Sequence, residues 1–374
     1  MNIRDLPTPF VTIDRAQARA NIAAMQALAE SAGVALRPHA KTHKSPAIAR
    51  WQIDAGAAGI CCAKLAEAEV FAAAGITNIR LPYPVNPVNA DRVRALIADG
   101  VALSIIVDDL DVARAWSQAM NGAAAPLDVL VKVDVGFHRC GVDPDSPRAL
   151  DVIAGVNDLS GLRFRGLLSH AGHSYAAGSG HDLAAIADRE IIILRTMAAR
   201  AREAGIDVAE ISVGSTPTAR FIPLQNGATE MRPGNYVFYD RTQVGLGATP
   251  LEGCAMHVIA TVVSRPVASR IVFDAGSKTL TLDAARGFGA VTGYGLVFPD
   301  LETPAPMGSI AIERLSEEHA VARVMPDCPL RTGDRVRILP NHACVVTNLA
   351  DELLLVDGLD VVDRIRVEAR GKNY

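Results

Sequence analysis

The sequence lacks a large excess of charge of either sign. Its 374 residues carry a formal net charge of −4, and the isoelectric point is about 6.1. A chain of this charge has no basic surface of the kind that binds nucleic acid or an anionic membrane. Residues 1–10 lack the charged and then apolar pattern of a signal peptide, and no stretch approaches the length of a membrane span. We therefore expect a cytoplasmic protein with no nucleic-acid or membrane partner.

Cysteine and lysine are both scarce. The six cysteines form no CxxC pair, and the adjacent Cys61 and Cys62 suit small buried hydrophobic residues better than a disulfide framework. The six lysines are Lys41, Lys44, Lys64, Lys132, Lys278 and Lys372. A chain with so few lysines offers few candidates for a lysine that forms a Schiff base.

A GxGxxG motif at the start of a helix is also absent, which argues against a doubly wound, dinucleotide-binding sheet. Instead, short apolar strand-forming segments recur with helical segments between them. The predicted strands are 35–41, 58–63, 79–83, 102–108, 128–134, 164–170, 209–214 and 228–232. The predicted helices are 16–32, 64–74, 88–99, 109–120, 146–155 and 182–204. Eight β/α units over about 230 residues match the size of a parallel (β/α)8 TIM barrel.

The pattern changes near residue 245. Short strands are predicted over 256–263, 270–273, 278–282, 310–314, 320–324, 335–338, 352–356 and 360–363. We therefore expect an α/β protein with two domains, a barrel over 15–245 and a C-terminal all-β domain over 246–374. Residues 1–14, which include an alternating strand at 10–14, can belong to the second domain.

Basic side chains concentrate in the segment 36–46. Prolines bracket this segment, so a strand is predicted rather than a helix, and Arg37, His39, Lys41 and His43 would then share one face. One interpretation is an exposed basic edge strand. The other is a crowded cationic site in which one lysine loses its proton more easily and attacks a carbonyl group. Lys41 is the first candidate for this Schiff-base lysine.

In such a barrel, the residues that close each strand meet at one mouth, where active sites form. Lys41 closes the first predicted strand. Asp134 closes the fifth and leads into a glycine-bounded loop that carries Arg139, and His170 closes the sixth, shortly before Tyr175. Arg139 alone could be an ordinary surface cation, but it is clustered with the others at one barrel mouth.

The loops after the seventh and eighth predicted strands contain glycine, hydroxyl and amide side chains. They read Val-Gly-Ser-Thr-Pro-Thr over 213–218 and Arg-Pro-Gly-Asn over 232–235. Free backbone N–H groups in such loops bind phosphate, and barrels most often bind it at these two loops. Either loop alone could be an ordinary turn. Both together, opposite a Schiff-base lysine, indicate pyridoxal phosphate.

His342 and Cys344 lie two residues apart on a segment predicted to be extended. Side chains at this spacing face the same way, and an imidazole with a thiolate suits zinc or a similar divalent ion. Two ligands make half a site, so a packed histidine and a buried cysteine are the alternative. The segment Ser-Glu-Glu-His at 316–319 offers further ligands or groups that support them.

Motifs along nearly the whole chain occur in a known order. They are Arg-Pro-His-Ala-Lys-Thr-His-Lys at 37–44, Gly-Ile-Cys-Cys-Ala-Lys at 59–64, Val-Asp-Val-Gly at 133–136, Arg-Cys-Gly at 139–141, Val-Gly-Ser-Thr-Pro-Thr at 213–218, Arg-Pro-Gly-Asn-Tyr at 232–236, Ser-Glu-Glu-His at 316–319 and Pro-Asn-His-Ala-Cys at 340–344. In this order they resemble the D-threonine aldolase and D-serine dehydratase family. The resemblance implies a pyridoxal-phosphate barrel of the alanine-racemase type, fold type III, with a C-terminal β-domain.

The resemblance also implies roles for particular residues. Lys41 would bond the cofactor, and His342 with Cys344 would bind the divalent metal, which is manganese, zinc or magnesium. Phosphate contacts are implied for Gly214, Ser215, Thr216, Gly234 and Asn235. Contacts to the cofactor ring or the substrate carboxylate are implied for His39, Arg139, Tyr175 and Arg232. Family members are commonly dimers, so a homodimer is expected.

Within the family, the motifs divide between two reactions. The segment 59–64 resembles the aldolases, whereas the His-x-Cys pair and the segment 214–218 resemble the dehydratases. We favour an aldolase that cleaves a D-3-hydroxy amino acid, such as D-threonine, into glycine and an aldehyde, with His43 or a hydroxide on the metal as the base. The alternative is a dehydratase that converts D-serine or D-3-hydroxyaspartate into a 2-oxo acid and ammonia. A racemase or a non-catalytic carrier of the cofactor would make no use of the metal pair.

Overall fold

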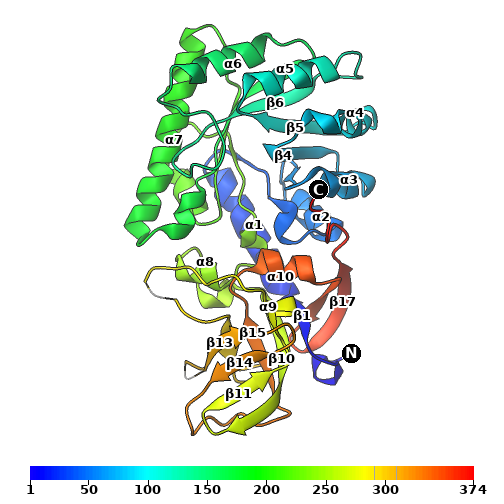
Figure 1. Cartoon of the computed structure of the whole chain (residues 1–374), viewed down its shortest axis with the longest axis vertical. Helices are drawn as coiled ribbons and strands as arrows, with labels where there is room; N and C mark the ends of the chain where they lie inside the picture. The colour runs from blue at the N-terminus through cyan, green and yellow to red at the C-terminus, as the bar shows by residue number, and fades with distance from the viewer. Residues whose placement is uncertain (290, 309) are drawn as a thin grey trace.

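The computed structural model describes residues 1–289, 291–308 and 310–374. The chain forms a barrel surrounded by helices and, below it in Figure 1, a second part built mainly of strands. The last strand leads the chain back to the barrel, where the backbone N–H of Ala66 donates to the carbonyl oxygen of Tyr374 at 3.1 Å. Within the described residues, none of the helices combines the length and apolar character that crossing a membrane requires.

Eight parallel strands form the barrel wall. In chain order they are β2 (Ala35–Leu36), β3 (Ile60–Cys61), β4 (Asn78–Pro84), β5 (Ala102–Val107), β6 (Leu127–Lys132), β7 (Leu162–Leu168), β8 (Glu210–Val213) and β9 (Glu230–Met231). From β3 to β9 each strand pairs with the next, and β2 pairs with β9. The ring closes where His39, just beyond β2, bridges to Cys61 in β3. The predicted (β/α)8 barrel is therefore confirmed.

Helices follow most of these strands and cover the outside of the barrel (Figure 1). They are α1 (Arg15–Ser31), α2 (Pro46–Asp54), α3 (Leu65–Ala73), α4 (Ala90–Ala98), α5 (Leu110–Ala119), α6 (Arg148–Asp158) and α7 (Gly180–Glu203). The short helix α8 (Arg241–Gly245) follows β9 and lies where the barrel meets the second part. Short side chains begin several of them: Asp14 accepts a hydrogen bond from the Gln17 N–H, and Asp109 accepts one from the Val112 N–H. Helix α2 was not predicted; its first residue is Pro46, at a position where a helix tolerates proline.

Short 3-10 helices complete the connections. They are η1 (Ile3–Asp5), η2 (Ala40–Thr42), η3 (Pro87–Asn89), η4 (Gly172–Ala176), η5 (Ala219–Leu224), η6 (Asn235–Val237) and η7 (Leu251–Gly253). Three of them, η2, η4 and η6, lie in loops that follow barrel strands and carry predicted site residues.

The predicted strand over 35–41 is wrong beyond residue 36. Strand β2 contains only Ala35 and Leu36, and the chain turns into η2 after His39. The four basic residues therefore do not share a face. Arg37 is buried and donates to Glu230, and His43 is buried on the other side of the turn. The turn follows from the barrel closure, because the backbone of residues 38 and 39 bonds to β3 and to the loop after β9.

The second part contains one more sheet system. Its strands are β1 (Phe10–Asp14), β10 (Met256–Val267), β11 (Arg270–Phe273), β12 (Leu296–Phe298), β13 (Ala311–Leu315), β14 (Ala320–Arg323), β15 (Arg335–Leu339), β16 (Glu352–Asp357) and β17 (Asp360–Arg366). Strand β1 lies between β10, which is antiparallel to it, and β16, which is parallel to it. The first strand of the chain thus belongs to this sheet and not to the barrel.

Two short helices of this part differ from the prediction. The segment 278–282, predicted as a strand, instead begins within helix α9 (Ser277–Leu280). Helix α10 (Ala343–Leu349) was not predicted because its β-branched residues do not favour a helix. His342 precedes α10 as its N-cap residue, so the segment that carries His342 and Cys344 is not extended.

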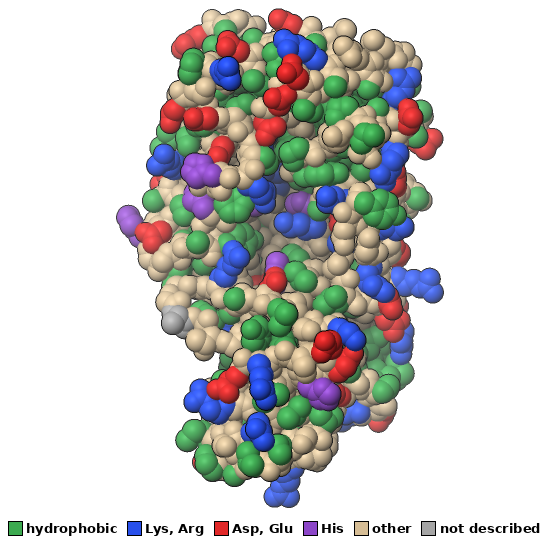
Figure 2. All heavy atoms as spheres, viewed as in Figure 1, with side chains coloured by type: hydrophobic (Ala, Val, Ile, Leu, Met, Phe, Trp, Pro, Cys, Tyr) green, Lys and Arg blue, Asp and Glu red, His purple; other side chains and the backbone are tan. Residues whose placement is uncertain are grey.

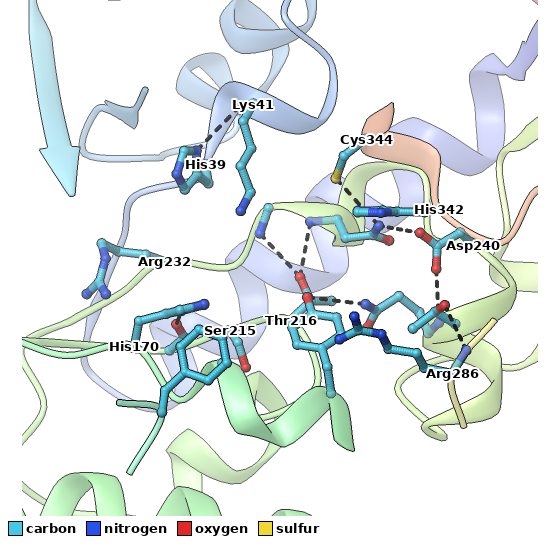
Figure 3. Close-up of a pocket in the computed structure, with 18 of the residues that line it drawn as sticks. His39, Lys41, His170, Ser215, Thr216, Arg232, Asp240, Arg286, His342 and Cys344 are labelled. Carbon is cyan, nitrogen blue, oxygen red and sulfur yellow. Dashed lines mark hydrogen bonds between the residues drawn. The ribbon is translucent and has the colours of Figure 1, made fainter. Parts of the chain in front are cut away.

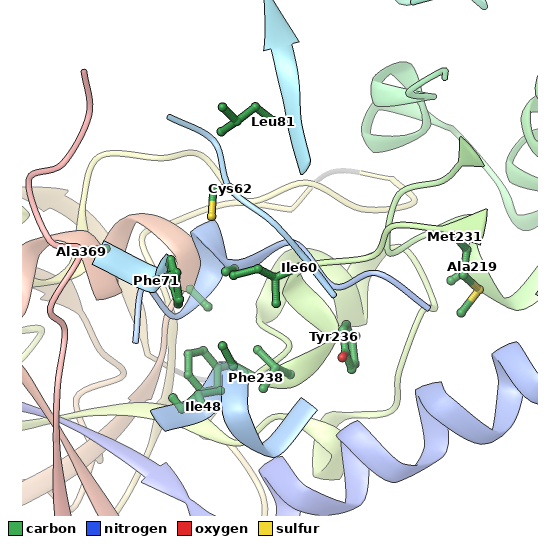
Figure 4. Packing of buried hydrophobic residues seen from close by; sticks show 14 of the residues in the cluster. Ile48, Ile60, Cys62, Phe71, Leu81, Ala219, Met231, Tyr236, Phe238 and Ala369 are labelled. Carbon is green, nitrogen blue, oxygen red and sulfur yellow. The ribbon is translucent and has the colours of Figure 1, made fainter. Parts of the chain in front are cut away.

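One buried apolar cluster runs through both parts (Figure 4). It includes Ile60 and Phe71 from the barrel and Val258 and Val336 from the second sheet. Cys61 and Cys62 are also fully buried, as predicted, and burial raises the pKa of the Cys61 thiol to about 11. Because the two parts share a core, the loops of one are held against the loops of the other.

A charge network fills the interior of the barrel below its mouth. Glu230 accepts from Arg37 at 2.6 Å and from Arg80 at 2.5 Å, and Arg80 also pairs with Glu210 at 2.6 Å. Burial alone would raise the pKa of Glu230, but Arg80 and Arg37 outweigh it and hold that pKa at about 2. The pairing replaces the water that these charges lost when the barrel formed.

Replacing Glu230 with Gln would leave the buried Arg37 without its charge partner and would leave the buried Arg80 with Glu210 alone. We expect the free energy of unfolding at pH 7 to fall by about 3–5 kcal/mol, measured by urea denaturation. Since the pKa of Glu230 is below its usual value of 4.5, its stabilisation is complete above that pH and is lost as the pH falls toward 2. The control is Glu302→Gln, which removes an exposed pair with Arg4 and should change little. Equal losses in both variants would contradict the prediction.

Candidate active site

A cavity of about 510 Å³ opens at the C-terminal ends of the barrel strands, where the second part faces the barrel. Its volume is in the range of small-molecule sites. Figure 2 shows the hollow between the two parts, with Lys, Arg and His side chains around it. The predicted site residues that line the cavity are His39, Lys41, Arg139, Tyr175, Gly214, Ser215, Thr216, Arg232, Gly234, Asn235, His342 and Cys344. Residues far apart in sequence thus meet as predicted.

His43 is the exception. Its imidazole is fully buried behind the turn, where Nε2 donates to Gln52 Oε1 at 3.2 Å and Nδ1 accepts from the Ser45 N–H at 3.2 Å. Its ring also packs perpendicular to the ring of Phe71. Burial lowers its pKa to about 4, so it is a neutral structural imidazole. The prediction that His43 takes a substrate proton is wrong, because η2 carries it away from the cavity.

Lys41 lies in η2 and points toward the cavity (Figure 3). The segment before it is held on both sides: the His39 N–H donates to the Pro233 carbonyl at 2.9 Å, and His39 Nδ1 accepts from the Lys41 N–H at 3.4 Å. Burial, followed by the charge of Lys41, holds the pKa of His39 well below its usual value. An exposed basic edge strand is therefore the wrong interpretation of this segment.

The two glycine-containing loops form a cradle beside Lys41. The backbone N–H groups of Gly234 and Asn235 both donate to the Thr216 hydroxyl, at 3.2 and 3.1 Å. Gly214 has φ of +114°, and a Cβ on Gly234 would lie 3.0 Å from the backbone oxygen of His39. Converging N–H groups and hydroxyls with no room for larger side chains suit a phosphate group.

Arg232 closes the inner end of the cavity. It is buried, donates to Ser212 Oγ at 2.5 Å and also bonds to the Ser169 carbonyl oxygen. Ser212 in turn donates to Glu230 at 2.5 Å, which connects Arg232 to the charge network below. Burial lowers the pKa of Arg232 despite Glu230 nearby. The cavity floor is therefore a fixed cation.

The wall opposite the barrel carries His342 and Cys344. Burial alone would raise the pKa of the Cys344 thiol, but the adjacent His342 lowers it, and Cys344 in turn raises the pKa of His342 to about 10. Asp283 Oδ2 lies 2.5 Å from His342 Nδ1, so the carboxylate holds a proton on that nitrogen, and an ion bound at Nε2 would displace the proton there. A thiolate and an oriented imidazole are ligands of zinc and similar ions.

Further ligands for such an ion are not supplied by the predicted segment 316–319. That segment forms the turn between β13 and β14, where the Ser316 N–H donates to the His319 carbonyl at 3.0 Å, and none of it lines the cavity. Across the described ranges of the chain, no three His, Cys, Asp or Glu side chains are grouped to hold a metal ion. Two protein ligands leave coordination positions for water or a substrate oxygen.

Three charged residues of the cavity were missed by the sequence prediction. Asp240 caps α8 through the Gln243 N–H at 3.0 Å and also accepts from the Ala343 N–H at 2.9 Å, so it ties α8 to the start of α10. Asp283 and Arg286 lie in the loop after α9. No repeating sequence pattern marks these three positions. Asp240 precedes a short helix, where an aspartate is expected as a helix cap and not as a site residue.

The barrel and the second part together define a class of fold. Residues 13–242 match the family model described as the alanine racemase, N-terminal domain, and residues 255–356 match the model of the serine dehydratase domain. Alanine racemase of Clostridium difficile 630 has the same fold, with a TM-score of 0.70 and 15% identity over 97% of this chain and 99% of that chain.

More similar relatives cover nearly the whole chain. D-threonine aldolase of an Arthrobacter species is 35% identical over 97% of this chain and 93% of its own length. D-threo-3-hydroxyaspartate dehydratase of Delftia sp. HT23 is 36% identical over 91% of both chains, and its solved structure superposes with a TM-score of 0.91 over 98% of both. Structures of that dehydratase include a cysteine-to-alanine mutant in a metal-free form and a histidine-to-alanine mutant.

The chain therefore belongs to the D-threonine aldolase and D-serine dehydratase family of the alanine-racemase fold class. Enzymes of this family are lyases that depend on pyridoxal phosphate and a metal ion. The sequence resemblance is therefore confirmed.

Because His43 lies outside the cavity, His43→Asn should retain the turnover rate within about threefold, although loss of a buried hydrogen bond lowers stability by about 1–3 kcal/mol. The measurements are kcat with saturating cofactor and the thermal unfolding midpoint. A hundredfold loss of kcat in a folded, cofactor-loaded variant would contradict the placement of His43.

Proposed function

We propose that this protein is a pyridoxal-phosphate- and divalent-metal-dependent lyase of the D-threonine aldolase type. It cleaves the Cα–Cβ bond of a D-3-hydroxy amino acid and releases glycine and an aldehyde. The observation that carries the proposal is the meeting of Lys41, the Thr216–Gly234 cradle and the His342–Cys344 pair around one cavity. We also propose a cytoplasmic homodimer, on the basis of the family resemblance and the composition.

The cavity fits the cofactor. Lys41 would bond its aldehyde carbon, the loops that carry Gly214–Thr216 and Gly234–Asn235 would hold its phosphate, and Arg232 would face its ring from the cavity floor. Asn235 Oδ1 is buried and has no hydrogen-bond partner in the described part of the chain. A buried polar atom without a protein partner is expected where a bound group supplies that partner. When bound, pyridoxal phosphate takes up the electrons of a bond broken at Cα.

The metal pair fits a role at the substrate hydroxyl. His342 Nε2 and Cys344 Sγ would bind the ion, which when bound lowers the pKa of a 3-hydroxyl group. The histidine and the cysteine that are substituted in the two dehydratase mutants lie two residues apart, as His342 and Cys344 do here. The structure of the cysteine mutant is the metal-free one. Asp283 orients His342, and Asp240 orients the first turn of α10 that carries Cys344.

The second candidate is a dehydratase that forms a 2-oxo acid and ammonia. It is favoured by the His-x-Cys spacing and by the segment 214–218, and the Delftia dehydratase is as similar to this chain as the Arthrobacter aldolase. In this case Lys41, once released from the cofactor, would be the base at Cα. Both reactions use the same hydroxyl contact at His342 and Cys344.

The deciding experiment is incubation of the cofactor- and metal-loaded protein with D-threonine and with D-3-hydroxyaspartate. Aldehyde and glycine in equal amounts support the aldolase. A 2-oxo acid with an equal amount of ammonia supports the dehydratase. Absence of both product pairs from both substrates would overturn the proposed lyase activity.

Lys41→Ala should abolish the absorbance band of lysine-bound cofactor, because Lys41 is the one lysine among the described residues that lines the cavity. The measurement is the near-ultraviolet and visible spectrum after dialysis against pyridoxal phosphate. The control is Lys64→Ala, a lysine near the barrel mouth whose amine stacks on Tyr83 at 4.8 Å, which should keep the band. A band that survives in the Lys41 variant would place the cofactor on another lysine.

Asp283→Asn should weaken metal binding by about 10–100-fold, because it removes the carboxylate that orients the ligand imidazole. Competition with a chromogenic chelator measures the affinity. Asp327→Asn changes an exposed carboxylate in the same part of the chain and serves as the matched control. Unchanged affinity in the Asp283 variant would show that Asp283 does not orient a metal ligand.

A further inference from the structure

Among the described residues, four lysine and arginine side chains line the cavity: Lys41, Arg139, Arg232 and Arg286. The proposed function accounts for two of them, because Lys41 bonds the cofactor and Arg232 is committed to Ser212 and the Ser169 carbonyl. Arg139 lies across the cavity in the loop after β6, where it stacks over the ring of Phe137 at 5.0 Å, and is available for the α-carboxylate that every amino acid carries. Arg286 has no role in that account.

The guanidinium of Arg286 has no hydrogen-bond or ion-pair partner within residues 1–289, 291–308 and 310–374. The backbone N–H of Arg286 donates to Thr242 Oγ1 at 3.4 Å, which holds the residue at the cavity edge. The loop backbone is further held against the barrel part, where the Phe288 N–H donates to the Gly245 carbonyl at 2.9 Å. The loop is thus held in place, and it presents the Arg286 guanidinium, with its N–H donors available, to the cavity.

The position of this loop decides which part of a substrate meets Arg286. Asp283, three residues earlier, accepts from His342, which the proposed function places at the substrate 3-hydroxyl. Figure 3 shows Arg286 on the same side of the cavity as His342 and Asp240, away from His39 and Arg232. The 3-hydroxyl is attached to Cβ, so the other substituent of Cβ lies beside this loop.

We infer that Arg286 is a specificity-determining residue that binds a carboxylate on Cβ, and that the substrates of this enzyme are D-3-hydroxy amino dicarboxylic acids. The inference rests on the proposed function for the placement of Cβ. An arginine fork matches a carboxylate with two parallel hydrogen bonds, whereas a methyl group would leave the same guanidinium without an acceptor. Leu282, also exposed in the cavity wall, is the side chain that a methyl group would need instead.

The test compares two ligands that lack the 3-hydroxyl and undergo neither proposed reaction. D-aspartate carries a carboxylate on Cβ, and D-2-aminobutyrate carries a methyl group there. Their dissociation constants are measured on the holoenzyme by the change that each makes in the spectrum of the bound cofactor. The variants are Arg286→Gln, Arg286→Lys and the control Arg331→Gln, which changes an exposed arginine of the same part that does not line the cavity.

The wild type should bind D-aspartate more tightly than D-2-aminobutyrate. Arg286→Gln should raise the dissociation constant of D-aspartate by about 10–100-fold, because a hydrogen bond to a charged group is lost. It should raise that of D-2-aminobutyrate by less than about threefold. Arg286→Lys should restore part of the preference, because it keeps the charge and loses the fork. Arg331→Gln should match the wild type.

Three results would overturn the inference. Equal weakening of both ligands would assign Arg286 to the α-carboxylate. A loss of pyridoxal phosphate affinity in Arg286→Gln would assign it to the cofactor phosphate. Equal dissociation constants of the two ligands in the wild type would show that the site does not recognise a carboxylate on Cβ.

These failures are distinct from a failure of the proposed function. A protein that releases acetaldehyde and glycine from D-threonine but binds both ligands alike retains the function and loses the inference. A protein that shows the arginine-dependent preference for D-aspartate but forms neither product pair retains the binding site and loses the proposed lyase reactions.

Discussion

The backbone hydrogen bonds that close the barrel are the constraint on which the site depends. The Cys61 N–H donates to the Pro38 carbonyl at 2.7 Å, and the His39 N–H donates to the Pro233 carbonyl at 2.9 Å. Since these bonds use the backbone of residues 38 and 39, the chain must turn directly above them, and η2 begins at Ala40. Lys41 is thereby placed at the mouth of the barrel, next to the loop that follows β9.

The two parts of the chain contribute different chemistry to the cavity. The barrel supplies Lys41 and the phosphate cradle, while the second part supplies His342 with Cys344 and the loop of Asp283 and Arg286. Asp240, at the start of α8, joins the two, because it caps its own helix and accepts from the first residue of α10. In the proposed function, the barrel would bind the cofactor, and the second part would select the substituents on Cβ.

The barrel and most of its site could be predicted from the sequence. Buried parallel strands are short apolar segments, and the rule that their carboxyl ends meet at one mouth brings together residues from distant loops. This reasoning placed Arg139, Thr216 and Gly234 correctly. It failed at His43, because alternation along a strand holds only while the strand continues, and the closure of the barrel ends β2 after two residues.

The contributions of the second part were harder to predict. Asp283 and Arg286 lie in an irregular loop, where no helix or strand periodicity predicts which way a side chain points. The sequence of α10 is rich in β-branched residues, which favour a strand. The identity of His342 and Cys344 as a pair was visible because two ligand types lay close in sequence. Their partner Asp283 lies 59 residues away and becomes a neighbour only through the folding of the second part.

The most direct test of this account is to identify the lysine that carries the cofactor. The holoenzyme is reduced with borohydride, which fixes the bond between cofactor and lysine, and its peptides are then mapped by mass spectrometry. The account predicts the label on Lys41 and on no other lysine. A label on Lys44, which the structure buries in a pair with Glu67 at 3.0 Å, would contradict the placement of the turn above the barrel closure.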